Sequence, residues 1–119
     1  PTRLGRLGLP NRLVGAATSE TMADAEGFVT PAIERLYGDL ARGGAGLIIT
    51  GHIYVERRGQ YAPNQTGLDE DAKIAGWRRL VDLVHREGGR ILAELSHAGS
   101  QSVVAGNVAV APSPVPNAI

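Results

Sequence analysis

The fold of this chain is decided by Leu40-Ala41-Arg42-Gly43-Gly44-Ala45-Gly46-Leu47-Ile48-Ile49-Thr50. The two adjacent glycines end an amphipathic helical pattern, as glycine commonly does at the C-terminus of a helix. The residues that follow are apolar without alternation, which is typical of a strand buried on both faces. The same succession recurs at residues 87–95, where Glu87-Gly88-Gly89 precedes a second apolar run. Two helices that each lead through a short turn into a buried strand indicate an α/β fold with parallel strands.

Two helices are expected from the positions of capping residues and apolar stripes. The first begins at Thr30-Pro31, where the hydroxyl can cap free N–H groups and the proline loses no needed donor, and it ends at residues 42–44. The second begins within residues 68–71, whose carboxylates suit the positive end of a helix, and ends at residues 87–89. Apolar residues recur along both at helical spacing. The stripes are Ile33, Leu36, Tyr37 and Leu40, then Ile74, Trp77, Leu80, Val81 and Val84.

Strands are expected at residues 12–16, 46–50 and 90–95, which gives the order β-α-β-α-β. The turns from helix to strand are short, whereas the segments that follow the strands are long: residues 17–30, 51–68, and 96 to the end. In a β/α barrel the long loops after the strands build the active site. The alternating leucines Leu4, Leu7 and Leu9 predict a small hairpin before the first strand. Residues 109–119 hold three prolines and are expected to be loop or linker.

The amino-acid composition limits the classes of protein to which this chain can belong. The 119 residues carry 12 Lys+Arg and 12 Asp+Glu, and only 4% of them are aromatic, so we expect no nucleic-acid partner. With no cysteine there is no disulfide and no Cys-based zinc site. Because the chain has no cysteine and its first residues do not form a charged and then apolar leader, we expect a cytoplasmic location. No apolar run reaches the roughly 20 residues that cross a bilayer, so we expect no membrane partner.

Several polar residues lie where the strands are expected to end. Glu94 is the penultimate residue of an apolar strand, and a buried carboxylate is costly unless it is paired or protonated. His97 follows that strand, and a lone loop histidine is either functional or simply hydrogen-bonded. Gly51, before His52, indicates a close approach to backbone or a tight turn. The small residues Ala16-Ala17-Thr18-Ser19 suit either a flat ligand or an ordinary polar loop.

Five segments in order resemble the N-terminal part of one known family. They are Asn11-Arg12-Leu13-Val14, residues 40–50, Gly76-Trp77-Arg78-Arg79-Leu80 with residues 85–89, Leu95-Ser96-His97-Ala98-Gly99, and Ala111-Pro112-Ser113. Together they resemble the old yellow enzyme family of NADH:flavin oxidoreductases over nearly the whole chain. The resemblance implies that residues 1–119 are the N-terminal β-α-β-α-β portion of a single TIM (β/α)8 barrel domain, incomplete in this chain. A complete barrel of this kind needs about 250 residues.

The resemblance also implies a function. Members of this family hold FMN at the carboxyl ends of the strands, take hydride from NAD(P)H and pass it to an activated alkene or related acceptor. The cofactor contacts carried over are Ala16, Ala17, Thr18 and Ser19 after the first strand, Gly51 and His52 after the second, and Glu94 near the end of the third. Thr21 and His97 are carried over as substrate contacts. The small-molecule substrate itself is not implied.

The sequence departs from the family at Glu94, where relatives have a glutamine that binds the pyrimidine edge of the flavin. An amide offers both a donor and an acceptor, whereas an ionised carboxylate only accepts. We therefore expect Glu94→Gln to strengthen FMN binding or to raise the reduction potential of the flavin. Ser100 replaces an arginine that usually follows His-Ala-Gly, and Thr21 replaces a tyrosine found in some relatives.

The expected partner is the remainder of the barrel, supplied by the same polypeptide or by a second chain, and a homo-oligomer is also compatible with the sequence. Three strands cannot close a barrel, and the third would have an unpaired edge that is prone to association. Two alternatives stay open. One is a flavin-free barrel module with a binding or structural role, and the other is a metal-assisted barrel enzyme that uses Glu94, His97 and His52 as ligands.

Overall fold

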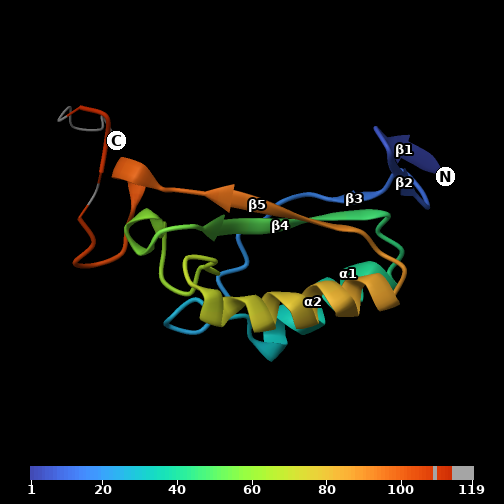
Figure 1. Ribbon diagram of the computed structural model, residues 1–119, viewed down its shortest axis with the longest axis horizontal. Coiled ribbons are helices and arrows are strands. Elements are labelled where there is room, and N and C mark those ends of the chain that lie inside the picture. Colours follow the sequence, from blue (N-terminus) through green and yellow to red (C-terminus); the bar gives the residue numbers. More distant parts are fainter. Residues whose placement is uncertain (109, 114–119) are drawn as a thin grey trace.

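Three parallel strands alternate with two helices in the computed structural model, which describes residues 1–108 and 110–113 (Figure 1). The elements in chain order are β3 (Val14–Gly15), α1 (Pro31–Arg42), β4 (Leu47–Tyr54), α2 (Ile74–Arg86) and β5 (Ile91–Ser96). The sheet order is β3-β4-β5, with Val14 opposite Leu47 and Ile48 opposite Ile91. Both helices cover the same face of the sheet (Figure 1). The expected β-α-β-α-β order with parallel pairing is confirmed.

The boundaries of α1 agree with the sequence signals. Thr30 is the N-cap, and its hydroxyl accepts a hydrogen bond from the Ile33 N–H at 3.5 Å. Pro31 is the first helical residue, and Gly44, with φ of 88°, turns the chain toward β4. Ile33 and Tyr37 are buried as expected, but Leu40 is 37% exposed. Leu40 is exposed because no helix or strand of the described part of the chain lies beyond β3 at the outer edge of the sheet.

The expected start of the second helix is wrong by several residues. A 3-10 turn at Asp71–Lys73 precedes α2, which begins at Ile74. The carboxylate of Asp69 does not cap the helix. Instead it binds the buried ammonium of Lys73, with Nζ to Oδ1 at 2.5 Å. This ion pair spans the 3-10 turn, which is wound more tightly than an α-helix. Ile74 is consequently 43% exposed, whereas Trp77, Leu80 and Val84 are buried as expected.

The second strand is longer than expected and includes Gly51 and His52. Beyond Thr50 it continues to Tyr54, because a β-bulge between Ile49 and His52 shifts the register and lets the pairing with β5 resume. An extra residue on one strand bends that strand and redirects its side chains. The third strand ends at Ser96, one residue later than expected, and the first strand pairs over only two residues.

The hydrophobic core lies between the helices and the sheet. Its members include Ile33, Tyr37, Ile48, Ile53, Trp77, Leu80 and Val84. On β5, by contrast, Leu92 and Leu95 are exposed. An apolar strand in the middle of a barrel would be covered on both faces. The exposure of β5 therefore reflects a sheet that is open at this edge.

The remaining described elements are small. The expected hairpin is present as β1 (Thr2–Leu4) paired antiparallel with β2 (Leu7–Leu9), and Gly5 has a φ of 57° in its turn. Short 3-10 turns occur at Arg57–Gly59 and Gly99–Gln101. Residues 110–113 have no helix or strand, in agreement with the expected loop, while residues 109 and 114–119 lie outside the described residues. Within the described part of the chain, no helix has the length and apolar character needed to cross a bilayer.

Candidate functional site

The carboxyl ends of β4 and β5 point the same way, toward the end of the sheet opposite the hairpin (Figure 1). One side chain joins three segments there. The His52 ring places Nε2 3.2 Å from the Ser19 hydroxyl and Nδ1 3.4 Å from the Ser96 hydroxyl. Ser19 follows β3, His52 is on β4, and Ser96 ends β5. Two residues expected at the cofactor, Ser19 and His52, are thus brought into contact.

Two further members of this group were not anticipated from the sequence. Ser96 contacts His52, as described above, and the buried amide of Gln65 donates from Nε2 to the His52 carbonyl at 2.8 Å and to the Ser96 hydroxyl at 3.4 Å. Ser96 stands within the family-like segment at residues 95–99 and could have been noticed for its place at a strand end. Gln65 lies in an irregular loop, and the sequence gives no signal for it. We call Ser19, His52, Ser96 and Gln65 the mouth network.

The segment that follows β3 is open and has small side chains at its start. Ala16 is exposed, and the Thr18 hydroxyl donates to the Ala16 carbonyl at 3.3 Å, within the segment itself. Thr21 has a φ of 44°, a left-handed conformation that is a true outlier for a β-branched residue. Such conformations persist only where surrounding contacts impose them, and they cluster at functional sites.

Gly51 is explained by contacts within this chain rather than by a turn. A Cβ at this position would collide with the Glu20 carboxylate and would stand 2.6 Å from the Thr18 carbonyl oxygen. The Gly51 N–H donates to the Tyr37 hydroxyl at 2.8 Å. The glycine therefore lets the segment after β3 cross closely over β4. Of the two explanations that the sequence offered for Gly51, a close approach or a tight turn, the structure shows the close approach.

Glu20 is a polar residue that sequence reasoning did not select. Its Oε1 is buried and has no hydrogen-bond partner among the described residues. Burial raises the pKa of Glu20, while hydrogen bonds from its own backbone and from Tyr37, and the positive charge of His52 when that ring is protonated, act in the opposite direction. Burial also raises the pKa of Tyr37 to about 12. The neutral phenol and the carboxyl group therefore stay protonated to higher pH than they would in water.

Glu94 lies opposite His52 in the ladder between β4 and β5, and its N–H donates to the Thr50 hydroxyl at 3.1 Å. Its side chain is exposed, so the burial expected from its apolar strand is not found in this chain. The physical reason is the open sheet, because among residues 1–108 and 110–113 no further strand pairs with the outer edge of β5. The Glu94 carboxylate is thus free to accept hydrogen bonds from a ligand.

The partners of His97 come from its own turn and from the loop after β4. Its Nδ1 accepts from the Gly99 N–H at 3.0 Å, and its Nε2 is 3.5 Å from the Glu56 carboxylate. A Cβ on Gly59 would stand 2.5 Å from the His97 ring, so that glycine makes room for it. A hydrogen bond from Arg58 is the main reason why the pKa of Glu56 is lowered. His97 is therefore held beside a carboxylate that stays ionised.

Metal ligation finds no support in the arrangement of these residues. Among residues 1–108 and 110–113, no group of three or more histidine, aspartate or glutamate side chains is placed to hold a metal ion. Glu94, His97 and His52 do not form the ligand set considered from the sequence.

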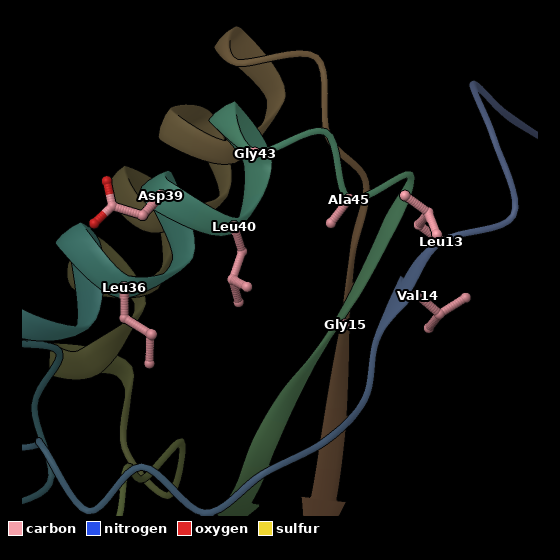
Figure 2. A pocket seen from close by; sticks show the side chains of 8 residues that line it. All are labelled: Leu13, Val14, Gly15, Leu36, Asp39, Leu40, Gly43 and Ala45. Atoms are coloured by element: carbon pink, nitrogen blue, oxygen red, sulfur yellow. The ribbon is translucent and has the colours of Figure 1, made fainter.

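Two hollows lie along the outer edge of the sheet between β3 and α1. The first is at the amino ends of β3 and β4, and the second is beside the segment that follows β3. One apolar pocket has a volume of about 390 Å³ and is shown in Figure 2, where Leu36 and Leu40 extend from α1 toward the side of the sheet bordered by β3. A neighbouring pocket of about 530 Å³ is lined in part by Ala16, Ser19 and Glu20. In a closed barrel this edge pairs with the last strand. The pockets therefore mark an uncovered edge of the sheet.

Comparison with known proteins decides what this arrangement represents. The sequence model of the NADH:flavin oxidoreductase / NADH oxidase family matches residues 1–118. The chain belongs to this family. Its resemblance to old yellow enzymes is confirmed by the structure of an old yellow enzyme homologue from Zymomonas mobilis, which superposes with a TM-score of 0.79 at 29% identity. That comparison covers 86% of this chain and 28% of the homologue.

Curated relatives also match along nearly the whole chain. A metal reductase of Desulforamulus reducens is 41% identical over 119 residues, which is 98% of this chain and 18% of the relative. An NADH oxidase of Thermoanaerobacter brockii is 36% identical over 118 residues, which is 96% of this chain and 18% of the relative. The chain thus spans less than a fifth of the length of these relatives and holds only part of the barrel. FMN and NAD(P)H are the cofactors of the family.

Proposed function

We propose that this chain forms the N-terminal part of a single FMN-binding barrel domain. The assembled protein uses NAD(P)H to reduce an activated alkene or a related acceptor. The observation that carries the proposal is the mouth network, which gathers Ser19, His52 and Ser96 at the carboxyl ends of three parallel strands in a member of a flavin oxidoreductase family. The carboxyl ends of barrel strands are where active sites of this fold are built.

The residues present fit a flavin in their chemistry. The polar edge of a flavin ring holds both a donor and acceptors, and this end of the sheet offers the Ser19 hydroxyl and the exposed Glu94 carboxylate. The small side chains of Ala16 and Ala17 leave the backbone open to a flat ring. When bound, FMN supplies the hydride chemistry, and the protein supplies position and electrostatics.

Each residue then has a defined task in the proposed site. Ala16, Ala17, Thr18 and Ser19 line one side of the cofactor. Gly51 lets that segment cross β4, and this brings His52 within reach of Ser19. Glu94 accepts a hydrogen bond from the ring. Thr21, with its strained backbone, and His97, held by Glu56, border the substrate.

The assembled protein requires the remaining strands, from the same polypeptide or from a second chain. Both edges of the sheet are suited to receive them. On one edge, Val14 and the α1 leucines are uncovered, and on the other, Leu92 and Leu95 are exposed. The cysteine-free composition fits a cytoplasmic enzyme.

Glu94 supports one alternative function. A carboxylate in the place of the family's amide lacks a donor for the ring, as expected if the site has lost its cofactor. In that case the chain is part of a flavin-free barrel with a binding or structural role.

The experiment that separates the two functions begins with cofactor binding. We would express this chain together with the remainder of the barrel, add FMN, and follow flavin absorbance and fluorescence during removal of unbound cofactor. Retained flavin in a 1:1 ratio supports the proposal, whereas a folded protein that stays colourless supports the flavin-free alternative. The loaded protein is then given NADH or NADPH with an α,β-unsaturated ketone, ferric ion or oxygen, because the relatives are named for different acceptors.

A further inference from the structure

The orientation of the Gln65 amide is fixed by two backbone groups. Its Oε1 accepts from the Tyr61 N–H at 2.7 Å, and its Nε2 donates to the His52 carbonyl at 2.8 Å. A backbone N–H only donates and a backbone carbonyl only accepts, so the oxygen and nitrogen of this amide cannot be exchanged. Gln65 is 3% exposed, which shields both bonds from water. The amide is therefore a donor of fixed direction.

The second N–H of that amide points at the Ser96 hydroxyl, at 3.4 Å. Ser96 Oγ accepts there, and its other contact is His52 Nδ1. If Nδ1 carried a proton, the Ser96 hydroxyl proton would have no acceptor among the described residues. A fully satisfied arrangement has Ser96 donating to an unprotonated Nδ1.

A neutral imidazole that accepts at Nδ1 carries its proton at Nε2. His52 then donates from Nε2 to Ser19 Oγ, across 3.2 Å. A doubly protonated ring would also donate from Nε2, so this last bond has the same direction in either state. With its oxygen accepting from His52, Ser19 has its own hydroxyl proton left to donate to another group.

We propose that Gln65, Ser96 and His52 form a directional hydrogen-bond chain that turns the Ser19 hydroxyl outward as a donor to the flavin. The inference rests on the proposed function, in which Ser19 borders FMN. His52, Ser96 and Gln65 act as positioning residues through Ser19. Successive bonds of one direction polarise one another, which strengthens the final donor. A donor at the ring stabilises its electron-rich reduced state and raises its reduction potential.

The fold explains how residues so distant in sequence meet. The β-bulge between Ile49 and His52 redirects the His52 side chain, and the close crossing at Gly51 brings the segment with Ser19 onto β4. The aromatic ring of Tyr61 lies 5.6 Å from that of His52, between centroids, and restricts its movement. The β-bulge and Gly51 together therefore bring the His52 ring into contact with Ser19.

The first test needs no cofactor. We would label the histidine side chains of the assembled, FMN-free protein with ¹⁵N and record the nitrogen shifts of His52 in the wild type and in Ser96→Ala. The inference requires a proton on Nε2 and an unprotonated, hydrogen-bonded Nδ1, with the Nδ1 shift changing in the variant. A proton found on Nδ1, with or without a second proton on Nε2, overturns the inference whether or not the protein binds FMN.

The second test is a double-mutant cycle on the reduction potential of bound FMN. Ser19→Ala and His52→Phe are each expected to lower the reduced-to-oxidised ratio about tenfold, which is roughly 30 mV for a two-electron couple. The double variant is expected to match Ser19→Ala alone. His52→Gln, which keeps a terminal N–H, is expected to recover most of the loss. His85→Phe, on the exposed side of α2, is the matched control and should leave the potential unchanged.

Additive effects of the two substitutions, or an unchanged potential in His52→Phe, overturn the inference while leaving the proposed function intact. Failure of the wild type to bind FMN overturns the proposed function instead. In that case the nitrogen shifts of His52 alone decide the direction of the hydrogen bonds from Gln65 to Ser19.

Discussion

The ammonium of Lys73 donates a hydrogen bond to the hydroxyl of Tyr54, with Nζ to Oη at 3.1 Å. The same hydroxyl donates to the Glu26 carbonyl at 2.8 Å and accepts from Arg57 at 2.8 Å. Burial of Lys73 would lower the pKa of its ammonium, but the hydrogen bonds from this group to Asp69 and Tyr54 outweigh burial and raise the pKa. The loops after β3 and β4 are thus joined through one phenol and one buried cation.

Replacing Lys73 by methionine should destabilise the assembled protein. The substitution keeps the length of the side chain but leaves Asp69 and the Tyr54 hydroxyl without their cation, and hydrogen bonds to charged groups contribute about 1.5–3 kcal/mol. We expect a loss of that size in the free energy of unfolding, measured with urea. Arg78→Met, at an exposed position of α2, is the control and should change it little. Equal losses in the two variants would contradict the importance of the buried pair.

Gly67→Ala should also be destabilising, because a Cβ at this position would collide with the ring of Tyr54. Overfilling a packed site typically costs about 1–3 kcal/mol. Gly8→Ala is the matched control, since a Cβ on Gly8 meets none of the described residues within 4 Å. Thermal unfolding of both variants provides the measurement, and the prediction is wrong if they have the same midpoint.

Glu20→Gln should change how stability depends on pH. The pKa of Glu20 is raised by burial, so the folded state holds this proton more tightly than the unfolded state does. The stabilisation is fully present below the ordinary glutamate pKa of about 4.3 and is lost as pH rises through the raised value. Glutamine removes this loss, and the variant should therefore gain stability over the wild type as the pH rises above about 4.3.

The measurement for Glu20 is urea unfolding of both proteins at several pH values above about 4.3. Glu26→Gln, at an exposed side chain in the same loop, serves as the control. A difference between Glu20→Gln and the wild type that does not grow with pH would contradict the effect of burial.

Glu94→Gln should strengthen FMN binding or raise the reduction potential of the flavin. The amide adds the donor that the carboxylate lacks and removes a negative charge facing a ring that becomes electron-rich when reduced. A tenfold change in the reduced-to-oxidised ratio corresponds to roughly 30 mV for a two-electron couple. Redox titration and flavin fluorescence measure the two quantities, with Asp82→Asn on α2 as the control. No positive shift together with unchanged affinity would refute the hypothesis.

The isolated chain of 119 residues should be poorly stable or aggregated. Its sheet exposes Leu13, Val14 and Leu95, the last of these at 59%, and exposed strand edges promote association. Size-exclusion chromatography and calorimetry of the isolated chain provide the measurement. A monomer with a sharp, cooperative thermal transition would contradict this expectation.

The arrangement of strands and helices was largely predictable because local signals determine it. Thr30 caps α1, Gly44 and Gly88 have positive φ where their helices end, and the apolar runs become β4 and β5. These features depend on residues within a few positions of one another. Hydrophobic periodicity and capping chemistry are readable from such short windows.

The features that the sequence did not predict correctly depend on contacts between residues that are distant along the chain. The later start of α2 follows from the burial of the Lys73 charge beside Tyr54, 19 residues earlier in the chain. The extension of β4 through Gly51 requires Glu20 and Thr18 to cross it, and a glycine followed by a histidine has the local character of a loop. Ser19 and His52 were selected through the family resemblance, whereas Gln65 reaches Ser96 across 31 residues and has no local pattern.

The two-residue ladder between β3 and β4 also bears on the order of folding. The β4-α2-β5 unit is continuous in sequence, so its contacts close short loops and form early. In a closed barrel the outer edge of β3 meets the last strand, which joins segments at opposite ends of the domain and costs the most loop entropy. During synthesis, β4, α2 and β5 can pair soon after they leave the ribosome, whereas the outer edge of β3 can be paired only after the final strand has been made.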